Sequence, residues 1–142
     1  MKKILLIDQD AFGTDYFCKE LRNDDFDVKW ITKAGETMES IASYNPDILI
    51  MEMMMPIPDK WNHAEHIIAD LGLKTGQVLL DFYIRKKYSR LPIINYTSAR
   101  VGLENRYCKY IQKPELTSVI INTVRLMLKE KYRRDKLNRV IK

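Results

Sequence analysis

Apolar and polar positions follow two distinct patterns along the chain. Continuous apolar runs predict strands buried on both faces, and apolar residues repeated every three or four positions predict amphipathic helices. We expect strands at residues 3–8, 26–31, 47–52, 91–96 and 107–112. We expect helices at residues 11–23, 34–44, 75–87 and from Pro114 onward. Strands that alternate with helices predict right-handed crossovers and a doubly wound α/β fold around a parallel sheet.

Some of these segments carry finer signals. Residues 26–31 alternate apolar and polar side chains, which is typical of an edge strand. The side chains expected to point inward from the first and third helices are Phe12, Tyr16, Phe17, Leu21, Val78, Leu79, Phe82 and Tyr83. Those of the last helix are Leu116, Val119, Ile120, Val124, Met127 and Leu128. The last set forms a stripe that predicts a helix packed on the sheet.

Composition and charge change this picture only at the C-terminal end. The 142 residues, 46% of them hydrophobic, are enough for one domain with its own core, which we place at residues 1–128. Residues 115–142 hold eight basic and three acidic side chains, so this segment carries the whole net charge of +5. We expect residues 129–142 to form a basic helical extension.

The sequence lacks the signals of a membrane-bound or exported protein. It has no run of about 18 apolar residues, and Met1-Lys2-Lys3 leads straight into the first strand without a signal-peptide pattern. Cys18 and Cys108 lack the spacing of a metal site, so we expect two reduced, packed thiols. We therefore predict a cytoplasmic protein that has no membrane partner.

The central apolar run delivers one carboxylate, Glu52, immediately before the segment Met53–Pro56. In an open parallel sheet, ligands and chemistry collect at the carboxyl ends of the strands. A carboxylate at that place is a nucleophile, a metal ligand or half of a buried ion pair.

Five segments of the chain together resemble the receiver domains of two-component response regulators, in particular the single-domain chemotaxis type. The matching segments are Ile4–Asp10, Pro46–Pro56, Gly76–Arg85, Pro92–Ala99 and Tyr110–Pro114. Each motif is weak alone, but five in the right order are specific, and the resemblance covers roughly residues 2–128. It implies a flavodoxin-like (βα)5 fold with a five-stranded parallel sheet in the strand order 2-1-3-4-5.

The resemblance also implies a phosphorylation site. In this family an aspartate attacks a phosphoryl donor while Mg²⁺, held by an acidic pair, neutralises the phosphoryl oxygens. A lysine and a hydroxyl then hold the acyl phosphate, and an aromatic side chain turns inward behind the hydroxyl. Carried over to this chain, the acceptor position is Glu52, the acidic pocket is Asp8, Gln9 and Asp10, the switch pair is Thr97 and Tyr110, and the pocket lysine is Lys113.

Two positions depart from the family pattern, and both weaken phosphorylation. Glu52 stands where the family has aspartate, and its extra methylene moves the carboxylate by about 1 Å, a displacement that can cost about 100-fold in rate. Gln9 stands at the position of a Mg²⁺ ligand, and an amide oxygen binds a hard cation poorly. We expect a degenerate, non-enzymatic receiver without a resident cofactor. Any Mg²⁺ site would be weak, formed by Asp8, Glu52 and the Met54 backbone.

The altered pocket leaves two versions of one function open. Glu52 either mimics the phosphorylated state by reaching Lys113 and Thr97, or forms an ion pair with Lys113 that only supports the fold. Both versions predict a stand-alone, phosphorylation-independent signalling module that binds a protein partner, either a kinase or an output protein. The alternative is a regulator that is still phosphorylated and requires Mg²⁺.

The chain also differs from the family in two lengths. Pro56 and Gly76 are twenty positions apart, which indicates an insertion at about residues 57–73. Its pattern predicts a short amphipathic helix beside the pocket. Its notable side chains are Trp61, His63, His66, Ile67, Ile68 and Leu71. The two histidines could bind a metal together with Asp59 or Asp70, although a solvated helix face is the commoner arrangement. Conversely, Thr97 and Lys113 are sixteen positions apart, which predicts a fourth helix shortened to a turn or two.

The basic extension leaves further partners open. It could be a solvated helix, a surface for a homodimer, or a site for an acidic protein. It could also contact nucleic acid through Lys131, Arg133, Arg134 and Arg139. Phosphate contacts by a basic helix are non-specific and salt-sensitive, and the sequence shows no DNA-binding module, so we do not expect nucleic acid to be the partner.

Overall fold

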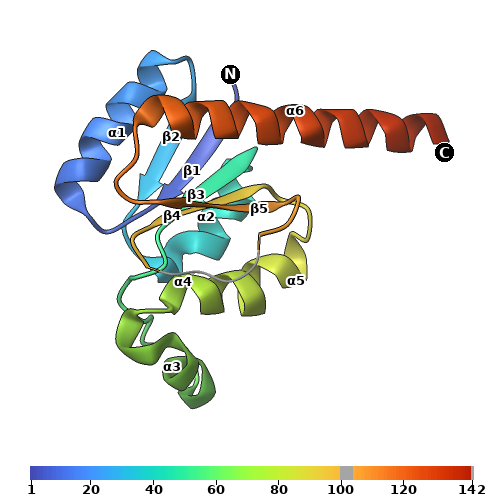
Figure 1. Cartoon of the computed structure of the whole chain (residues 1–142). Coiled ribbons are helices and arrows are strands. Elements are labelled where there is room, and N and C mark those ends of the chain that lie inside the picture. The colour runs from blue at the N-terminus through green and yellow to red at the C-terminus, as the bar shows by residue number, and fades with distance from the viewer. Residues whose placement is uncertain (100–103, 142) are drawn as a thin grey trace.

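Five parallel strands form one sheet in the order β2-β1-β3-β4-β5 in the computed structural model, which describes residues 1–99 and 104–141 (Figure 1). The strands are β1 (Lys3–Ile7), β2 (Asp27–Ile31), β3 (Ile48–Met51), β4 (Ile93–Thr97) and β5 (Cys108–Gln112). The predicted strand order and the edge position of residues 26–31 are confirmed. The central strand ends at Met51, so Glu52 is the first residue of the loop that follows.

Helices cover both faces of the sheet. Their bounds are α1 (Ala11–Asn23), η1 (Ala34–Glu36), α2 (Thr37–Tyr44), α3 (His63–Ala69), η2 (Asp70–Gly72), α4 (Thr75–Val78), the π-helical η3 (Leu79–Ile84), α5 (Arg85–Lys87) and α6 (Thr117–Ile141). Helices α1 and α6 lie on one face, and α2 with the α4–η3–α5 segment lies on the other (Figure 1). The predicted extension of the last helix is confirmed, because α6 runs for 25 residues. It begins at Thr117 and not at Pro114.

The sheet separates two apolar cores. Leu5 and Ile7 of β1 pack into the core beneath α2 and α4, and Ile4 and Leu6 pack into the core beneath α1 and α6. Side chains alternate between the two faces of a strand, so a strand that is apolar throughout fills both cores. This is the reason that the central strands read as continuous apolar runs.

The expected inward face of α1 is wrong at two positions. Phe17 and Leu21 are buried, but Phe12 is 91% exposed and Tyr16 is 67% exposed. Phe12 and Tyr16 form one i, i+4 pair, and Phe17 and Leu21 form another, rotated by roughly 140° around the helix. Only one pair can face the sheet, and Phe17 and Leu21 do so together with the buried Cys18.

The last helix also packs through fewer residues than expected. Ile120, Val124 and Met127 are buried, whereas Leu116 and Val119 are exposed, because Leu116 precedes the helix and Val119 lies at the margin of its packed face. Phe82 of η3, which we also expected to point inward, is 38% exposed.

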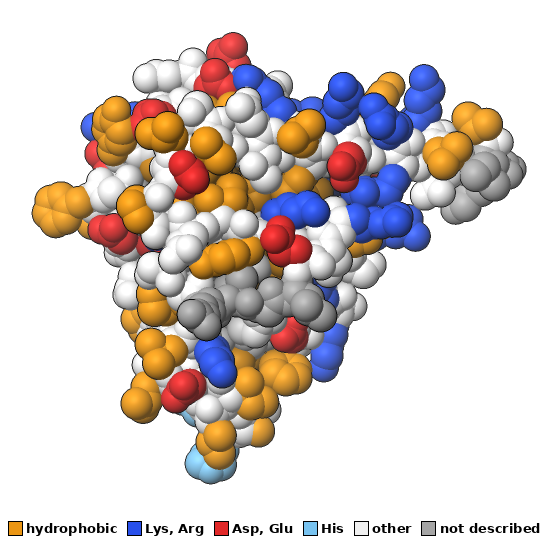
Figure 2. Space-filling view, in the orientation of Figure 1, with side chains coloured by type: hydrophobic (Ala, Val, Ile, Leu, Met, Phe, Trp, Pro, Cys, Tyr) orange, Lys and Arg blue, Asp and Glu red, His pale blue; other side chains and the backbone are white. Residues whose placement is uncertain are grey.

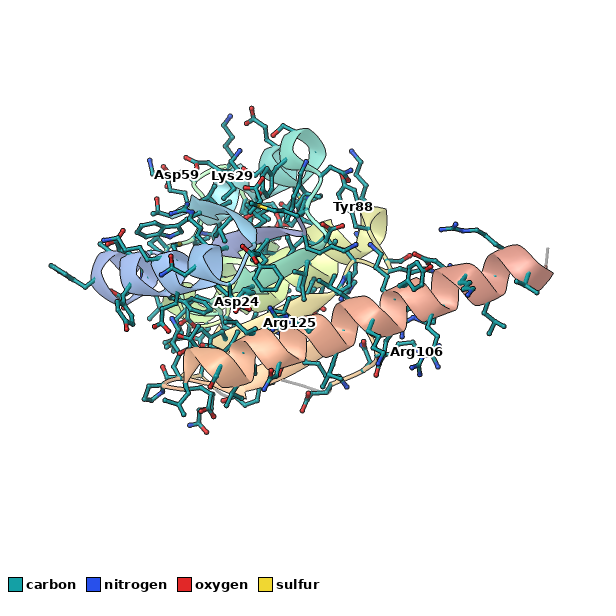
Figure 3. All side chains as sticks on the ribbon, turned by 90° about the horizontal axis from the view of Figure 1, so that it is seen from above. Asp24, Lys29, Asp59, Tyr88, Arg106 and Arg125 are labelled. Atoms are coloured by element: carbon teal, nitrogen blue, oxygen red, sulfur yellow. The ribbon has the colours of Figure 1, made fainter. Side chains whose placement is uncertain are left out.

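An ion pair between Arg125 and Asp24 joins α6 to the end of α1 (Figure 3).

The insertion forms α3, which projects from the body beside α4 (Figure 1). Asn62 and Glu65 make a reciprocal capping box that starts this helix. Trp61 anchors it by stacking on Tyr83, with ring centroids 5.3 Å apart. The predicted amphipathic packing is only partly realised, since Ile67, Ile68 and Leu71 are exposed.

The connection between β4 and β5 falls partly outside the described residues. The predicted shortened fourth helix concerns this segment, of which residues 100–103 are not described. The flanking residues 98–99 and 104–107 form no helix, and Asn105 pairs with Cys108 in an isolated bridge. Within the described residues, every helix is too short or too polar to span a bilayer.

Candidate functional site

Four strand ends bring their polar side chains together at one edge of the sheet. Asp8 follows β1, Glu52 follows β3, Thr97 ends β4, and Lys113 follows β5. The parallel registers of these strands fix the arrangement, because their carboxyl ends meet at the same edge. Asp8, Glu52 and Thr97 are all buried, so their polar groups need partners within the protein.

Both carboxylate oxygens of Glu52 are occupied by protein donors. Its Oε1 accepts hydrogen bonds from the amide N–H groups of Met53, at 2.8 Å, and Met54, at 3.1 Å, and from the hydroxyl of Thr97. Its Oε2 accepts one from Lys113 Nζ at 2.9 Å. This carboxylate is only 6% exposed, and its charge is balanced by one ammonium group and three further donors.

Gly76 allows α4 to approach this loop closely. A Cβ at this position would lie 2.6 Å from the carbonyl oxygen of Glu52 and 2.7 Å from Cα of Met53, so no side chain fits. The amide of Gly76 instead donates to the carbonyl of Met53 at 2.8 Å. The start of α4 therefore holds the backbone that presents the Glu52 carboxylate.

Lys113 bridges the two buried carboxylates. Its Nζ lies 2.5 Å from Asp8 Oδ2 and 2.9 Å from Glu52 Oε2. Burial disfavours the charged ammonium, but the hydrogen bonds to Asp8 and Glu52 outweigh this effect and raise the pKa of Lys113 above its ordinary value. The three side chains therefore form a charged cluster in which the single cation serves both anions.

Tyr96 belongs to this cluster, although the sequence did not single it out. The Lys113 ammonium lies 5.2 Å from the centroid of the Tyr96 ring, and the ring packs against Phe17 at 5.6 Å. The Tyr96 hydroxyl accepts a hydrogen bond from the amide of Glu115 at 3.2 Å. The sequence shows that Tyr96 directly precedes Thr97. The contact between Tyr96 and Lys113 depends on the pairing of β4 with β5.

Three predicted site residues lie outside the cluster. Gln9 and Asp10 are exposed, and Asp10 caps α1 by accepting from the amide of Phe12 at 3.2 Å. Tyr110 is half-buried in β5, and its backbone amide donates to a carboxylate oxygen of Glu104 at 3.2 Å. The amide N–H of Asp10 donates to Asp8 Oδ1 at 2.9 Å, and Asp10 lines the cleft beside the cluster.

The donor set does not suit a Mg²⁺ ion of the kind that the family resemblance implies. A hard cation needs carboxylate lone pairs in near-octahedral geometry, but those of Asp8 and Glu52 point at Lys113 and at backbone or hydroxyl donors. Lys113 already stands between the two carboxylates, and Gln9 offers only an amide. A metal that used these bonded lone pairs would have to displace the hydrogen bonds they now accept.

A cleft of about 520 Å³ opens beside the cluster. Asp8, Lys113 and Tyr96 form its floor, and residues of α1 and of the segment leading into α6 form its walls. The remaining lining residues are Asp10, Gly13, Thr14, Tyr16, Phe17, Glu20, Pro114, Glu115, Leu116 and Thr117. The charged cluster is thus reachable from one side, next to the exposed Tyr16 and Leu116.

The other candidate metal site is not supported. His63 and His66 lie on α3. Neither Asp59 nor Asp70 completes a metal site with them, because the described residues contain no group of three or more His, Cys, Asp or Glu side chains that could hold a metal. The insertion also contributes no residue to the cleft beside Lys113.

The two thiols are packed as predicted. Cys18 and Cys108 are both free and buried, and burial raises the pKa of each thiol. The Cys108 sulfur accepts a hydrogen bond from the Asn95 amide at 3.2 Å. Neither residue has the lowered thiol pKa of a reactive cysteine.

Known proteins similar to this chain are response regulators. The response regulator protein GraR of Staphylococcus aureus is 26% identical over 132 residues, a match that covers 92% of this chain and 53% of GraR. The chain thus spans about half the length of the curated relatives it matches. No protein-family model matches the sequence.

Solved receiver domains share the fold. A CheY-like response regulator receiver domain protein from Methanospirillum hungatei superposes with a TM-score of 0.71 at 19% identity, covering 94% of this chain and 98% of that one. The signal receiver domain of a putative LuxO repressor from Vibrio parahaemolyticus gives 0.70 at 16% identity, covering 96% of both chains. The chain therefore has the fold of a response regulator receiver domain.

Proposed function

We propose that this chain is a signalling module of the two-component type that works without being phosphorylated. The observation that carries the proposal is the bonding of Glu52, whose carboxylate already engages both Thr97 and Lys113. In the family that the chain resembles, a hydroxyl and a lysine at these positions hold the acyl phosphate. Here a carboxylate of the protein itself takes both bonds.

The same bonding opposes phosphorylation of Glu52. A nucleophilic oxygen needs a free lone pair aimed at the donor, and a cation to neutralise the transferred phosphoryl group. Glu52 Oε1 accepts three hydrogen bonds, and Oε2 is held by Lys113. Freeing either oxygen would leave a buried ion or donor without its partner, which is costly.

The contact with Thr97 favours a fixed signalling conformation over a purely structural ion pair. A structural pair requires only Lys113, but Glu52 also fixes the Thr97 hydroxyl, which accepts from the amide of Ala99 at 3.1 Å. The carboxylate therefore reaches the backbone that follows β4 through one hydroxyl group. A carboxylate has fewer oxygens and less charge than a phosphoryl group, so the mimicry covers only these two contacts.

The domain that signals comprises residues 1–128, with residues 129–142 as an extension, and its partner is another protein. A kinase and an output protein both remain options, and so does a second copy of the chain. The cleft beside Lys113 combines exposed apolar side chains, such as Tyr16 and Leu116, with the charged cluster, and a protein surface of mixed character suits it.

Intact-protein mass spectrometry after incubation with Mg²⁺ and a small acyl-phosphate donor tests the proposal. The wild type is expected to stay unmodified, whereas the double variant Glu52→Asp, Gln9→Asp, which restores the family's acceptor and ligand, is expected to gain one phosphoryl group. The matched control is Glu52→Asp alone, which separates the acceptor from the metal ligand. A wild-type chain that gains a phosphoryl group on Glu52 would refute the proposal.

A further inference from the structure

A second cleft lies where the extension of α6 leaves the body of the protein. It has a volume of about 230 Å³ and is lined by three segments far apart in the sequence. Arg90 comes from the loop after α5, Arg106 and Tyr107 come from the segment before β5, and the rest comes from α6. Figure 1 shows that the C-terminal half of α6 projects beyond the sheet, and Figure 3 places Arg106 beside it.

Cationic side chains dominate this cleft. Among the described residues, its charged lining consists of Arg90, Arg106, Lys131 and Arg134 against one carboxylate, Asp135. Within the described part of the chain, Arg90, Arg106 and Lys131 take part in no ion pair. An adjoining hollow of about 410 Å³ shares Arg106 and Arg134. Figure 2 shows basic side chains gathered at the base of the projecting helix.

Two contacts position the Arg134 guanidinium, but one of its nitrogens has no hydrogen-bond acceptor among the described residues. Its guanidinium lies 4.6 Å from the centroid of the Tyr107 ring, and its Nη1 is 3.7 Å from a carboxylate oxygen of Glu130. Its Nη2 is buried and, among the described residues, has no hydrogen-bond partner. A buried donor without an acceptor is unfavourable, so a group with no acceptor among the described residues favours an oxyanion from a ligand.

We propose that this cleft binds a small phosphate-bearing anion, such as a polyphosphate or a nucleotide. Arginine is the side chain best suited to phosphate, because its planar fork of N–H groups makes paired hydrogen bonds to phosphate oxygens. Four cations around one hollow match a ligand with several negative charges. This site is independent of Glu52 and of the proposed signalling role.

The geometry favours a small ligand over nucleic acid. Among the α6 residues that line the cleft, Lys131, Arg134 and Asn138 recur at helical spacing on one face. Arg90 and Arg106 line the cleft from the body. A hollow of about 230 Å³ between two walls approaches the size of small-molecule pockets, roughly 300–1,000 Å³, and is narrow for a duplex. A nucleic-acid surface would instead use Lys136 and Arg139, which are exposed and are not among the described residues that line either hollow.

Isothermal titration of the full chain with inorganic tripolyphosphate tests the proposal. We expect saturable one-to-one binding that weakens about tenfold in Arg106→Gln and in Arg134→Gln, since each loses a charged hydrogen bond. Lys136→Gln and Arg139→Gln remove the same charge outside the cleft and are expected to change affinity less than twofold, by loss of long-range attraction only. Arg106 is exposed, so its variant keeps the test valid if Arg134→Gln fails to fold.

Two results would overturn the proposal. Non-saturable binding, or equal losses in the cleft variants and the control variants, would show that the charge acts only as a diffuse field. Tighter binding of a single-stranded oligonucleotide than of tripolyphosphate, with the largest losses in Lys136→Gln and Arg139→Gln, would assign the extension to nucleic acid.

Discussion

Charged side chains are paired with one another in one cleft of this protein, whereas cations are in excess in the other. At the carboxyl edge of the sheet, Lys113 neutralises Asp8 and Glu52, and every carboxylate oxygen of Glu52 has a donor. Beneath the projecting part of α6, four cations face one carboxylate, and the buried Nη2 of Arg134 has no acceptor among the described residues. A receiver fold would be expected to bind its phosphoryl group at the first place. This difference underlies both proposals, because the charges of the first cleft are paired within the protein and the cations of the second remain available for an anion.

The largest expected effect is the loss of Lys113. Replacing it by alanine leaves two buried carboxylates without their cation, which should lower the free energy of unfolding by about 3–5 kcal/mol. Urea denaturation followed by circular dichroism measures the change. Lys19→Ala, which breaks the exposed Lys19–Asp15 pair, is the control and should cost less than about 1 kcal/mol. Equal stability of Lys113→Ala and wild type would mean that the charged cluster contributes nothing to the fold.

Neutralising Glu52 should have a smaller effect. Glu52→Gln keeps the shape and leaves Asp8 to pair with Lys113, but it weakens the bonds from Thr97 and Lys113, so we expect a loss of about 1–3 kcal/mol. Combining it with Lys113→Ala should cost less than the sum of the two single changes, because each removes the same interaction. Strict additivity in this double-mutant cycle would show that the two side chains do not interact.

Alkaline pH should weaken the cluster in a defined direction. The pKa of Lys113 is raised in the folded protein by its two carboxylates against the effect of burial, so its stabilisation is complete below the unfolded pKa of about 10.4. That stabilisation is lost as pH rises through the folded pKa. The stability difference between wild type and Lys113→Ala should therefore be constant from neutral pH to about pH 10 and shrink above it. A difference that grows with pH would contradict the assigned direction.

The smallest effect is expected in the cleft beneath α6. Arg106 is exposed and forms no ion pair within the described residues, so Arg106→Gln should change the free energy of unfolding by less than about 0.5 kcal/mol. Thermal denaturation of this variant and of Lys113→Ala compares the contributions of the two clefts to stability. A loss as large as that of Lys113→Ala would mean that Arg106 supports the fold and is not held free for a ligand.

Much of the fold and the membership of the pocket cluster could be predicted from the sequence. Continuous apolar runs identify buried strands, and the parallel order places Asp8, Glu52 and Thr97 at one edge, because the ends of parallel strands coincide. The strands are short and have strong apolar patterns, so the local sequence and the tertiary packing favour the same secondary structure. The roles assigned to these residues remain predictions that the experiments above address.

Other features depend on contacts that no local pattern encodes. Phe12 and Tyr16 of α1 looked as apolar as Phe17 and Leu21, and only the docking of the helix chose between the two pairs. Tyr96 meets Lys113 through the pairing of β4 with β5. Arg90 and Arg106 are sixteen positions apart in the sequence, and they line one cleft together with residues of the 25-residue helix α6.

The central claim is that the receiver pocket is closed by its own side chains and does not take a phosphoryl group. Amide nuclear magnetic resonance with Mg²⁺ and fluoroberyllate, a phosphoryl analogue, tests it at the Met53 and Ala99 signals, whose N–H groups bond to Glu52 Oε1 and Thr97 Oγ1. We predict no shift in the wild type and a saturable shift in Glu52→Asp, Gln9→Asp. A saturable shift of both signals in the wild type would contradict the account.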